Sequence, residues 1–202
     1  MTRVILIRHP QTTNDLYLPI SQDHVDAGLT EAGRQAAAAL KLRLASEPET
    51  GRIFVSPLMR ARETAQTLYP GKAIEIIDGF REIDKGFPAW IAAHPDHADL
   101  TTKQWEDQFN AGANLPNKLQ FPYPSGVTVS SFMKSVWKIF LETVEDCHAD
   151  TIAIISHNGP IKSILSMSQN DPAQYYRHSI EYASYSVIER SGGKWRIIGM
   201  NK

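Results

Sequence analysis

Hydrophobic positions recur with two different periods along the chain, and each period predicts a type of element. Short β-branched and apolar runs bounded by turn residues predict buried strands at 3–8, 52–55, 73–77 and 151–155. Longer stretches with apolar residues three and four positions apart predict helices at 31–45, 58–68, 131–147 and about 160–168. Two further strand-like runs flank Ser191-Gly192-Gly193 and predict a hairpin of strands 184–189 and 194–200.

Two helix starts carry local signals. Thr30 precedes the alanine-rich helix and has the hydroxyl of an N-cap residue. Pro57 follows strand 52–55, and we expect it in the first turn of helix 58–68, where its missing N–H costs nothing.

Strands that alternate with helices predict an α/β fold with a mostly parallel central sheet flanked by helices and the hairpin at one side. A length of 202 residues suits one domain, 1–202. The exception is the segment of about 84–126, which is rich in proline and aromatic residues. It is too apolar for a linker and too irregular for a core repeat, so we expect a lid-like insertion over the strand edge.

Composition narrows the class of protein. Hydrophobic residues make up 42% and charged residues 21%, which favours a packed core. A formal net charge of −1 argues against a broad nucleic-acid or membrane surface but allows a local basic pocket. The single cysteine, Cys147, excludes an intramolecular disulfide. With no signal peptide and no run of the ~20 apolar residues that span a bilayer, we expect a soluble cytoplasmic protein.

Two predicted strands end at a histidine. Strand 3–8 leads into Arg8-His9, and strand 151–155 leads into Ser156-His157. The carboxyl ends of parallel strands meet at one edge of the sheet, where open α/β proteins bind ligands. We therefore expect both histidines in one site, and the neighbouring arginine indicates an anion such as phosphate.

Arg8, His9, Arg60 and His157 together suit a phosphoryl group. Guanidinium forks match phosphoryl oxygens, and a neutral imidazole can attack phosphorus and form a covalent intermediate. Nearby arginines favour the neutral imidazole, and a second histidine, cationic or as an N–H donor, can neutralise transition-state charge. Glu82, just beyond strand 73–77, is the candidate proton donor, and Asp84 is its rival.

The turn after His9 supplies further polar candidates. Gln11, Thr12 and Asn14 form turns by default, and we also consider them phosphate contacts. His94 and His97 lack further ligands at zinc spacing, so we expect a loop surface there and no metal site.

Five segments occur in an order that resembles the histidine phosphatase superfamily, in its phosphoglycerate-mutase-like branch. The resemblance covers about residues 4–165. It rests on five segments: Arg8-His9-Pro10-Gln11-Thr12, Asp26–Ala36, Ser56–Ala65, Arg81–Gly86 and Ile155-Ser156-His157-Asn158-Gly159. One such segment would be weak evidence, whereas five in order are specific.

The resemblance implies a role for each matched position. His9 would accept the phosphoryl group, which Arg8, Arg60 and His157 would hold. Glu82 would protonate the leaving group and then activate water. Asn158 and Gly159, in the second histidine motif, would lie at the phosphate. The family needs no metal or organic cofactor.

The implied activity is hydrolysis of small phosphorylated metabolites. Two alternatives remain: phosphoryl transfer of the phosphoglycerate mutase type, and a phospho-ligand binding module that has lost turnover. The long active-site segments of the cofactor-dependent mutases are missing, which argues against the first. Phosphopeptides are also possible substrates.

The chain departs from the family pattern in three places. Pro10 replaces the usual glycine, which removes a backbone donor and fixes φ near −65°. The family's asparagine, six residues after the histidine, is Asp15 here, and Asn14 stands one residue early. Either the turn is one residue tighter or an acidic group lies beside the pocket. Gly126-Val127-Thr128 also replaces the family's Gly-Glu-Ser.

Overall fold

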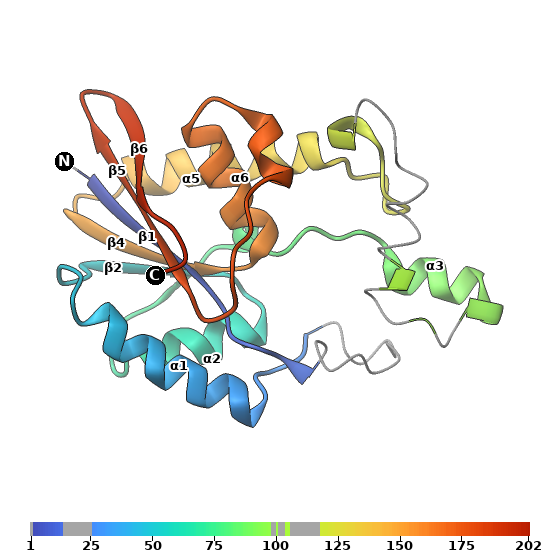
Figure 1. Ribbon diagram of the computed structural model, residues 1–202, viewed down its shortest axis with the longest axis horizontal. Helices are drawn as coiled ribbons and strands as arrows, with labels where there is room; N and C mark the ends of the chain where they lie inside the picture. The colour runs from blue at the N-terminus through green and yellow to red at the C-terminus, as the bar shows by residue number, and fades with distance from the viewer. Residues whose placement is uncertain (1, 14–25, 98–99, 101–103, 106–117) are drawn as a thin grey trace.

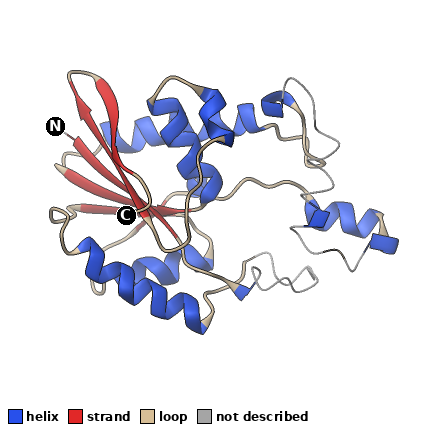
Figure 2. Cartoon of the chain, in the orientation of Figure 1, coloured by secondary structure: helices blue, strands red, loops and turns tan. Residues whose placement is uncertain are grey.

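The computed structural model describes residues 2–13, 26–97, 100, 104–105 and 118–202. Within these residues six strands form one sheet in the order β3-β2-β4-β1-β5-β6 (Figures 1 and 2). The strands are β1 (Thr2–Arg8), β2 (Arg52–Val55), β3 (Glu75–Ile76), β4 (Thr151–Ser156), β5 (Tyr185–Ser191) and β6 (Lys194–Gly199).

The predicted mostly parallel sheet is confirmed. The strands β3, β2, β4 and β1 pair in parallel, and β5 and β6 add an antiparallel hairpin beside β1. Gly192 and Gly193 turn the hairpin with φ values of 57° and 76°, a region that L side chains rarely adopt. The central pair β1–β4 aligns Arg8 with Ser156, so both strands end at the same level.

Helices cover both faces of the sheet, as Figures 1 and 2 show for α1 and α2 on one side and α5 and α6 on the other. Their bounds are α1 (Glu31–Leu44), α2 (Met59–Leu68), α5 (Val129–Glu145) and α6 (Asn158–Ser168). The 3-10 helix η3 (Asp78–Phe80) directly precedes the Glu82 segment, and the 3-10 helix η6 (Pro172–Tyr176) lies between α6 and β5.

Alternate residues of the central strands enter two separate cores. Val4 and Leu6 of β1 pack with α5 and α6, whereas Ile5 and Ile7 pack with α1 and α2. All four β1 side chains are at most 1% exposed. A strand that is buried on both faces reads as a continuous apolar run, which is why the run before Arg8 is so distinct.

Most element predictions are confirmed, with small corrections at their ends. Thr30 is the N-cap of α1 and accepts a hydrogen bond of 2.9 Å from the Gly33 amide. The placement of Pro57 was wrong, because α2 begins at Met59 after an N-cap at Leu58. Strand β3 has only two paired residues because it is the sheet edge and pairs with β2 alone.

The two later helices begin two residues earlier than predicted. In α5 a capping box between Thr128 and Ser131 sets the start at Val129. In α6 the first residue is Asn158, directly after the N-cap His157. In α5 the buried Val129 continues, four residues before Met133, the apolar face that the prediction began at Phe132.

The segment 84–126 is described only in part. It contains α3 (Phe87–Ala93), η4 (Pro95–His97) and η5 (Lys118–Gln120), and Figure 1 shows α3 set apart from the sheet. Trp105 is 1% exposed and contacts the rings of Phe87 and Trp90, with centroids 5.0 Å and 6.0 Å away. The segment therefore has a small aromatic core of its own, and its action as a lid stays a prediction.

No described helix is both long and apolar enough to cross a bilayer.

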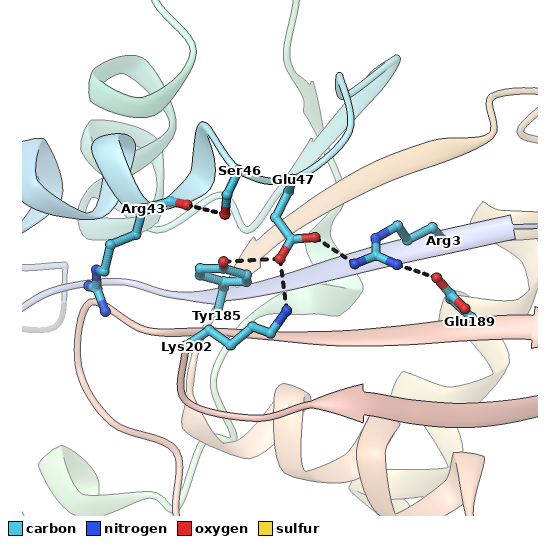
Figure 3. Close-up of polar contacts among 7 residues, drawn as sticks. All are labelled: Arg3, Arg43, Ser46, Glu47, Tyr185, Glu189 and Lys202. Carbon is cyan, nitrogen blue, oxygen red and sulfur yellow. Dashed lines mark hydrogen bonds and ion pairs between the residues drawn. The ribbon is translucent and has the colours of Figure 1, made fainter.

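A network around Glu47 joins the connection after α1 to the sheet (Figure 3). The Glu47 carboxylate accepts hydrogen bonds from Arg3 at 2.6 Å, Tyr185 at 3.0 Å and Lys202 at 3.0 Å, and Arg3 also pairs with Glu189. The Glu47 side chain is 5% exposed. Burial raises the pKa of Glu47, but the hydrogen bonds from Arg3, Lys202 and Tyr185 outweigh burial and leave the pKa below its ordinary 4.5.

The Glu47→Gln variant should lower the free energy of unfolding at pH 7 by roughly 2 kcal/mol, because hydrogen bonds to a charged group are lost. A lowered folded-state pKa stabilises the protein above the unfolded-state value of 4.5, and this stabilisation disappears as pH falls through the folded-state value. Urea unfolding from pH 7 to pH 3 should therefore show the two proteins converge in acid.

Glu49→Gln is the matched control, because Glu49 also pairs with a lysine but is 87% exposed. It should change stability little, since exposed pairs contribute little. A constant difference between wild type and Glu47→Gln across the whole pH range would contradict the ionic role of Glu47.

Candidate active site

The ends of β1 and β4 bring the two predicted histidines together. The His9 amide donates to the Ser156 carbonyl at 3.2 Å, which extends the parallel ladder by one residue. The rings of His9 and His157 then lie edge to face with centroids 5.0 Å apart. His9 is 6% exposed and His157 is fully buried.

The His9 ring is held in one tautomer. Its Nδ1 lies 2.7 Å from the Pro10 carbonyl oxygen. A carbonyl can only accept, so Nδ1 carries the proton and the neutral ring keeps its lone pair on Nε2. Pro10 lacks an amide proton, but the atom that orients His9 is its carbonyl, which every residue has.

His157 is held by two neighbours. Its Nδ1 accepts from Arg60 Nε at 3.2 Å, so its Nε2 carries the proton and donates to Ser56 Oγ at 2.7 Å. Burial lowers the pKa of His157 well below 6.5, and repulsion from His9 in its protonated form and from the Arg60 and Arg8 charges lowers it further. Of the two forms considered from the sequence, the geometry favours the neutral ring.

Ser56 is a site residue that the sequence reasoning missed. It lies at the carboxyl end of β2, the same edge as the histidines, and its side chain is fully buried. Its signal was its position directly after a buried strand. Beyond it, the Met59 amide donates to Asp26 Oδ1 at 2.6 Å, which anchors the start of α2 and places Arg60 in its first turn.

Glu82 lies at the N-terminus of α6. The Gly159 amide donates to both carboxylate oxygens, at 3.1 and 3.2 Å, and the Ile83 amide donates to Oε1 at 2.9 Å. A Cβ at Gly159 would lie 2.2 Å from Glu82 Oε1, so any larger residue would displace the Glu82 carboxyl group from its present position. The predicted role of Gly159 at the phosphate therefore has a competing explanation, which is to support Glu82.

Asp84, the rival acid, is engaged elsewhere. Its Oδ1 accepts from the Gly86 amide at 2.8 Å, and its carbonyl accepts from Ser125 Oγ at 2.7 Å. These contacts stabilise the turn that precedes α3. Glu82 therefore lies at the N-terminus of α6, a helix that directly follows His157 in the sequence, whereas Asp84 binds residues of the segment 84–126.

Gln11 and Thr12 connect the turn after His9 to α1. The Gln11 carbonyl accepts from the Thr30 amide at 3.2 Å, and its side-chain Oε1 accepts from Thr30 Oγ1 at 3.1 Å. Thr12 is 2% exposed and forms an isolated bridge with Leu29. Both residues hold the turn in place. Asn14 and Asp15 lie outside the described residues, and Asn158 is the first residue of α6.

Arg8 is held by a segment outside every sequence motif. One guanidinium N–H donates to the Ile180 carbonyl, and the guanidinium carbon lies 3.6 Å from the centre of the Tyr182 ring. The Tyr182 ring also lies 5.7 Å from the His9 ring and is 41% exposed. Sequence reasoning missed Tyr182 because no periodicity or motif marks it.

The arrangement places a nucleophilic nitrogen, two guanidinium groups and a carboxyl group around one strand edge. The described residues include no cluster of three or more potential metal-ligating side chains. Such a site can bind an oxyanion, form a bond to it at His9 and move a proton at Glu82.

The lowered pKa of His157 predicts that acid destabilises the protein. The unfolded chain binds a proton at His157 near pH 6.5 and the folded chain does not, so the free energy of unfolding falls as pH drops below about 6.5. The contribution is ~1.4 kcal/mol per pH unit, until the lowered folded-state pKa is reached. Denaturant titrations between pH 7.5 and 5 should measure this slope.

The control is His157→Gln, which should flatten that slope whatever its effect on stability at pH 7.5. His178, whose pKa is lowered by burial and by Lys162, stays in both proteins and contributes equally. An unchanged slope in the variant would refute the buried neutral histidine.

The sequence matches a known protein family over nearly its whole length. The histidine phosphatase superfamily (branch 1) matches residues 4–202. The chain is 26% identical over 199 residues to phosphoglycerate mutase-like protein 4 of Arabidopsis thaliana, which covers 96% of this chain and 82% of that protein. It is 25% identical to 6-phosphofructo-2-kinase/fructose-2,6-bisphosphatase of Caenorhabditis elegans, covering 84% of this chain but 34% of that larger protein.

Solved structures share the fold. A phosphoserine phosphatase mutant of Entamoeba histolytica in complex with phosphoserine has a TM-score of 0.80 at 24% identity, over 100% of this chain and 98% of that one. A mycobacterial glucosyl-3-phosphoglycerate phosphatase in complex with VO3 has a TM-score of 0.77 at 20% identity, over 100% and 99%. With residues 4–202 matched, the chain belongs to the histidine phosphatase superfamily.

Proposed function

We propose that the protein is a phosphatase that hydrolyses phosphomonoesters of small metabolites through a covalent phosphohistidine on His9. The observation that carries the proposal is the hydrogen bond from His9 Nδ1 to the Pro10 carbonyl, which puts the ring proton on Nδ1 and so makes Nε2 the nucleophilic nitrogen of the neutral ring. Structural relatives with phosphoserine or VO3 bound support a small phosphorylated ligand.

In the first step His9 Nε2 attacks phosphorus in line with the leaving oxygen. An N–P bond forms as the P–O bond breaks, and the guanidinium groups of Arg8 and Arg60 bind the equatorial oxygens. His157 stays neutral, so it contributes hydrogen bonding and the position of Arg60 rather than a full charge. Glu82 gives its proton to the leaving alkoxide.

In the second step water replaces the leaving group. The Glu82 carboxylate takes a proton from water as the oxygen attacks phosphorus, the N–P bond breaks, and phosphate leaves with His9 restored. Glu82 is thus acid and then base, and its hydrogen bonds to Gly159 and Ile83 keep the carboxyl group in one place for both steps.

Phosphoryl transfer is the competing activity, because the Arabidopsis relative is named as mutase-like. It would use the same phosphohistidine but return the group to a hydroxyl of the bound acid. Incubation with 3-phosphoglycerate separates the two: a phosphatase releases inorganic phosphate, whereas a mutase forms 2-phosphoglycerate. A binding module would do neither.

His9→Ala should reduce turnover of a generic phosphomonoester by about 10³-fold or more, because the covalent route is lost. Rapid acid-free quench of the wild type with a labelled phosphomonoester should trap label on the protein, and the variant should trap none. Full turnover by His9→Ala would refute the mechanism, and phosphate-ester binding without turnover in the wild type would favour the binding module.

Glu82→Gln and Gly159→Ala should both slow hydrolysis in a way that depends on the leaving group. Gln cannot donate the proton, and a Cβ at 159 displaces the carboxyl group. We expect about 10²-fold loss of kcat/KM for an alkyl phosphate with Glu82→Gln. Loss for para-nitrophenyl phosphate should be much smaller, because nitrophenolate leaves without a proton.

Asp84→Asn is the matched control and should keep the leaving-group pattern of the wild type. Equal losses on both substrates with Glu82→Gln would show that Glu82 is not the acid. If instead Asp84→Asn lost activity mainly on the alkyl phosphate and little on para-nitrophenyl phosphate, Asp84 would be the acid.

A further inference from the structure

The segment Ser179–Ser184 holds Arg8 at three points. The Ser184 carbonyl accepts from the Arg8 amide at 3.0 Å, and the Ile180 carbonyl accepts from the guanidinium. The guanidinium carbon lies over the Tyr182 ring, 3.6 Å from the ring centre, which is a cation–π contact. The backbone and the charged head of Arg8 are therefore set by one short segment.

The Asn201 side chain forms three hydrogen bonds to this segment. Its Oδ1 accepts from the Glu181 amide at 3.0 Å and from Ser184 Oγ at 3.2 Å, and its Nδ2 donates to the Ser179 carbonyl at 2.8 Å. One amide side chain thus links the first, third and last residues of the segment. The next residue, Lys202, exchanges two backbone hydrogen bonds with Tyr185, at 3.0 and 3.3 Å, which fixes Asn201 relative to β5.

The backbone of this region departs from ordinary conformations. Ala183 has φ of 50° and Asn201 has φ of 52°, the left-handed region. Asparagine tolerates this region, but alanine there costs about 1 kcal/mol. A strained conformation of this kind persists only where surrounding contacts hold it. Here the Arg43 guanidinium donates to the Ala183 carbonyl, and Asn201 binds the residues on either side of Ala183 in the segment.

We propose that Asn201 is a positioning residue of the phosphoryl site, acting through Ser179–Ser184 on Arg8, with Tyr182 as the surface on which the guanidinium stacks. The inference rests on the proposed role of Arg8 in binding phosphoryl oxygens. A free arginine head has several rotatable bonds, and fixing it before the ligand arrives removes that cost from binding. The planar fork also binds an oxyanion well in one orientation only.

The test measures orthovanadate affinity by calorimetry, a readout that needs no turnover. Asn201→Gly removes the three hydrogen bonds without straining the backbone, because glycine accepts positive φ. We expect its Kd for orthovanadate to rise about 10-fold. Asn170→Gly is the matched control: it is also an asparagine with positive φ, 55°, but it follows α6 and is exposed. Its Kd should equal that of the wild type.

A double-mutant cycle with Arg8→Ala separates positioning from a general structural role. If Asn201 acts through Arg8, the Asn201→Gly change should have no further effect once Arg8 is alanine. Tyr182→Phe, which keeps the ring face, should retain affinity, and Tyr182→Leu should lose it. Asn201→Asp is a second variant, with the acceptor kept and the donor lost, and should fall between wild type and Asn201→Gly.

Three results would overturn the proposal. They are an unchanged Kd in Asn201→Gly, an equal loss in the wild-type and Arg8→Ala backgrounds, and no orthovanadate binding by the wild type. The proposed phosphatase function fails in a different way. In that case the double-mutant cycle is still non-additive for orthovanadate, but the wild-type protein turns over no phosphomonoester. Turnover together with an additive cycle would leave the phosphatase intact and remove the role of Asn201.

Discussion

The structure depends on the parallel pairing of β1 with β4, in which Arg8 lies opposite Ser156. This register brings both strands to an end at one level, so the next residue of each is a histidine. A slip of one residue would exchange the two cores, because alternate side chains of β1 enter different helix layers. The burial that stabilises the sheet is therefore the same constraint that brings the histidine rings within 5.0 Å.

From that pairing follows a division of proton positions between the two rings. Pro10 accepts from His9 Nδ1, and Arg60 donates to His157 Nδ1, so in their neutral forms the two rings carry their protons on opposite nitrogens. For His157, burial and the neighbouring arginine charges disfavour a second proton and keep its pKa low. Because the site uses the carbonyl of residue 10, proline in place of the family's glycine leaves this orientation intact. The candidate acid, Glu82, is positioned from the same strand end, because its carboxylate accepts from the amide of Gly159, two residues after His157.

Sequence patterns predicted what is encoded locally. Strands buried on both faces appear as short apolar runs, and the residues that end them, Arg8, His9 and His157, are visible without a structure. The start of α2 was misjudged because the Asp26 carboxylate, 33 residues away, meets the Met59 amide where Pro57 alone suggested an earlier start. Contacts that join distant segments through loop backbone carry no periodicity. The contacts of Asn201, and likewise the side-chain hydrogen bond between Ser56 and His157, therefore became apparent only in three dimensions.

The two candidate phosphoryl-binding arginines are positioned by different kinds of structure, one by a helix and the other by a loop. Arg60 lies in the first turn of α2, whose start is held by Asp26, and it contacts His157 through its Nε. Arg8 lies at a strand end, and its head is set by loop carbonyls and an exposed tyrosine ring. Arg60 therefore takes its position from a helix packed into the core, whereas Arg8 takes its position from a loop that binds both its backbone amide and its guanidinium. If Arg8 binds the phosphoryl group as proposed, substitutions at the exposed Tyr182 should change that binding with less effect on the core than substitutions in α2.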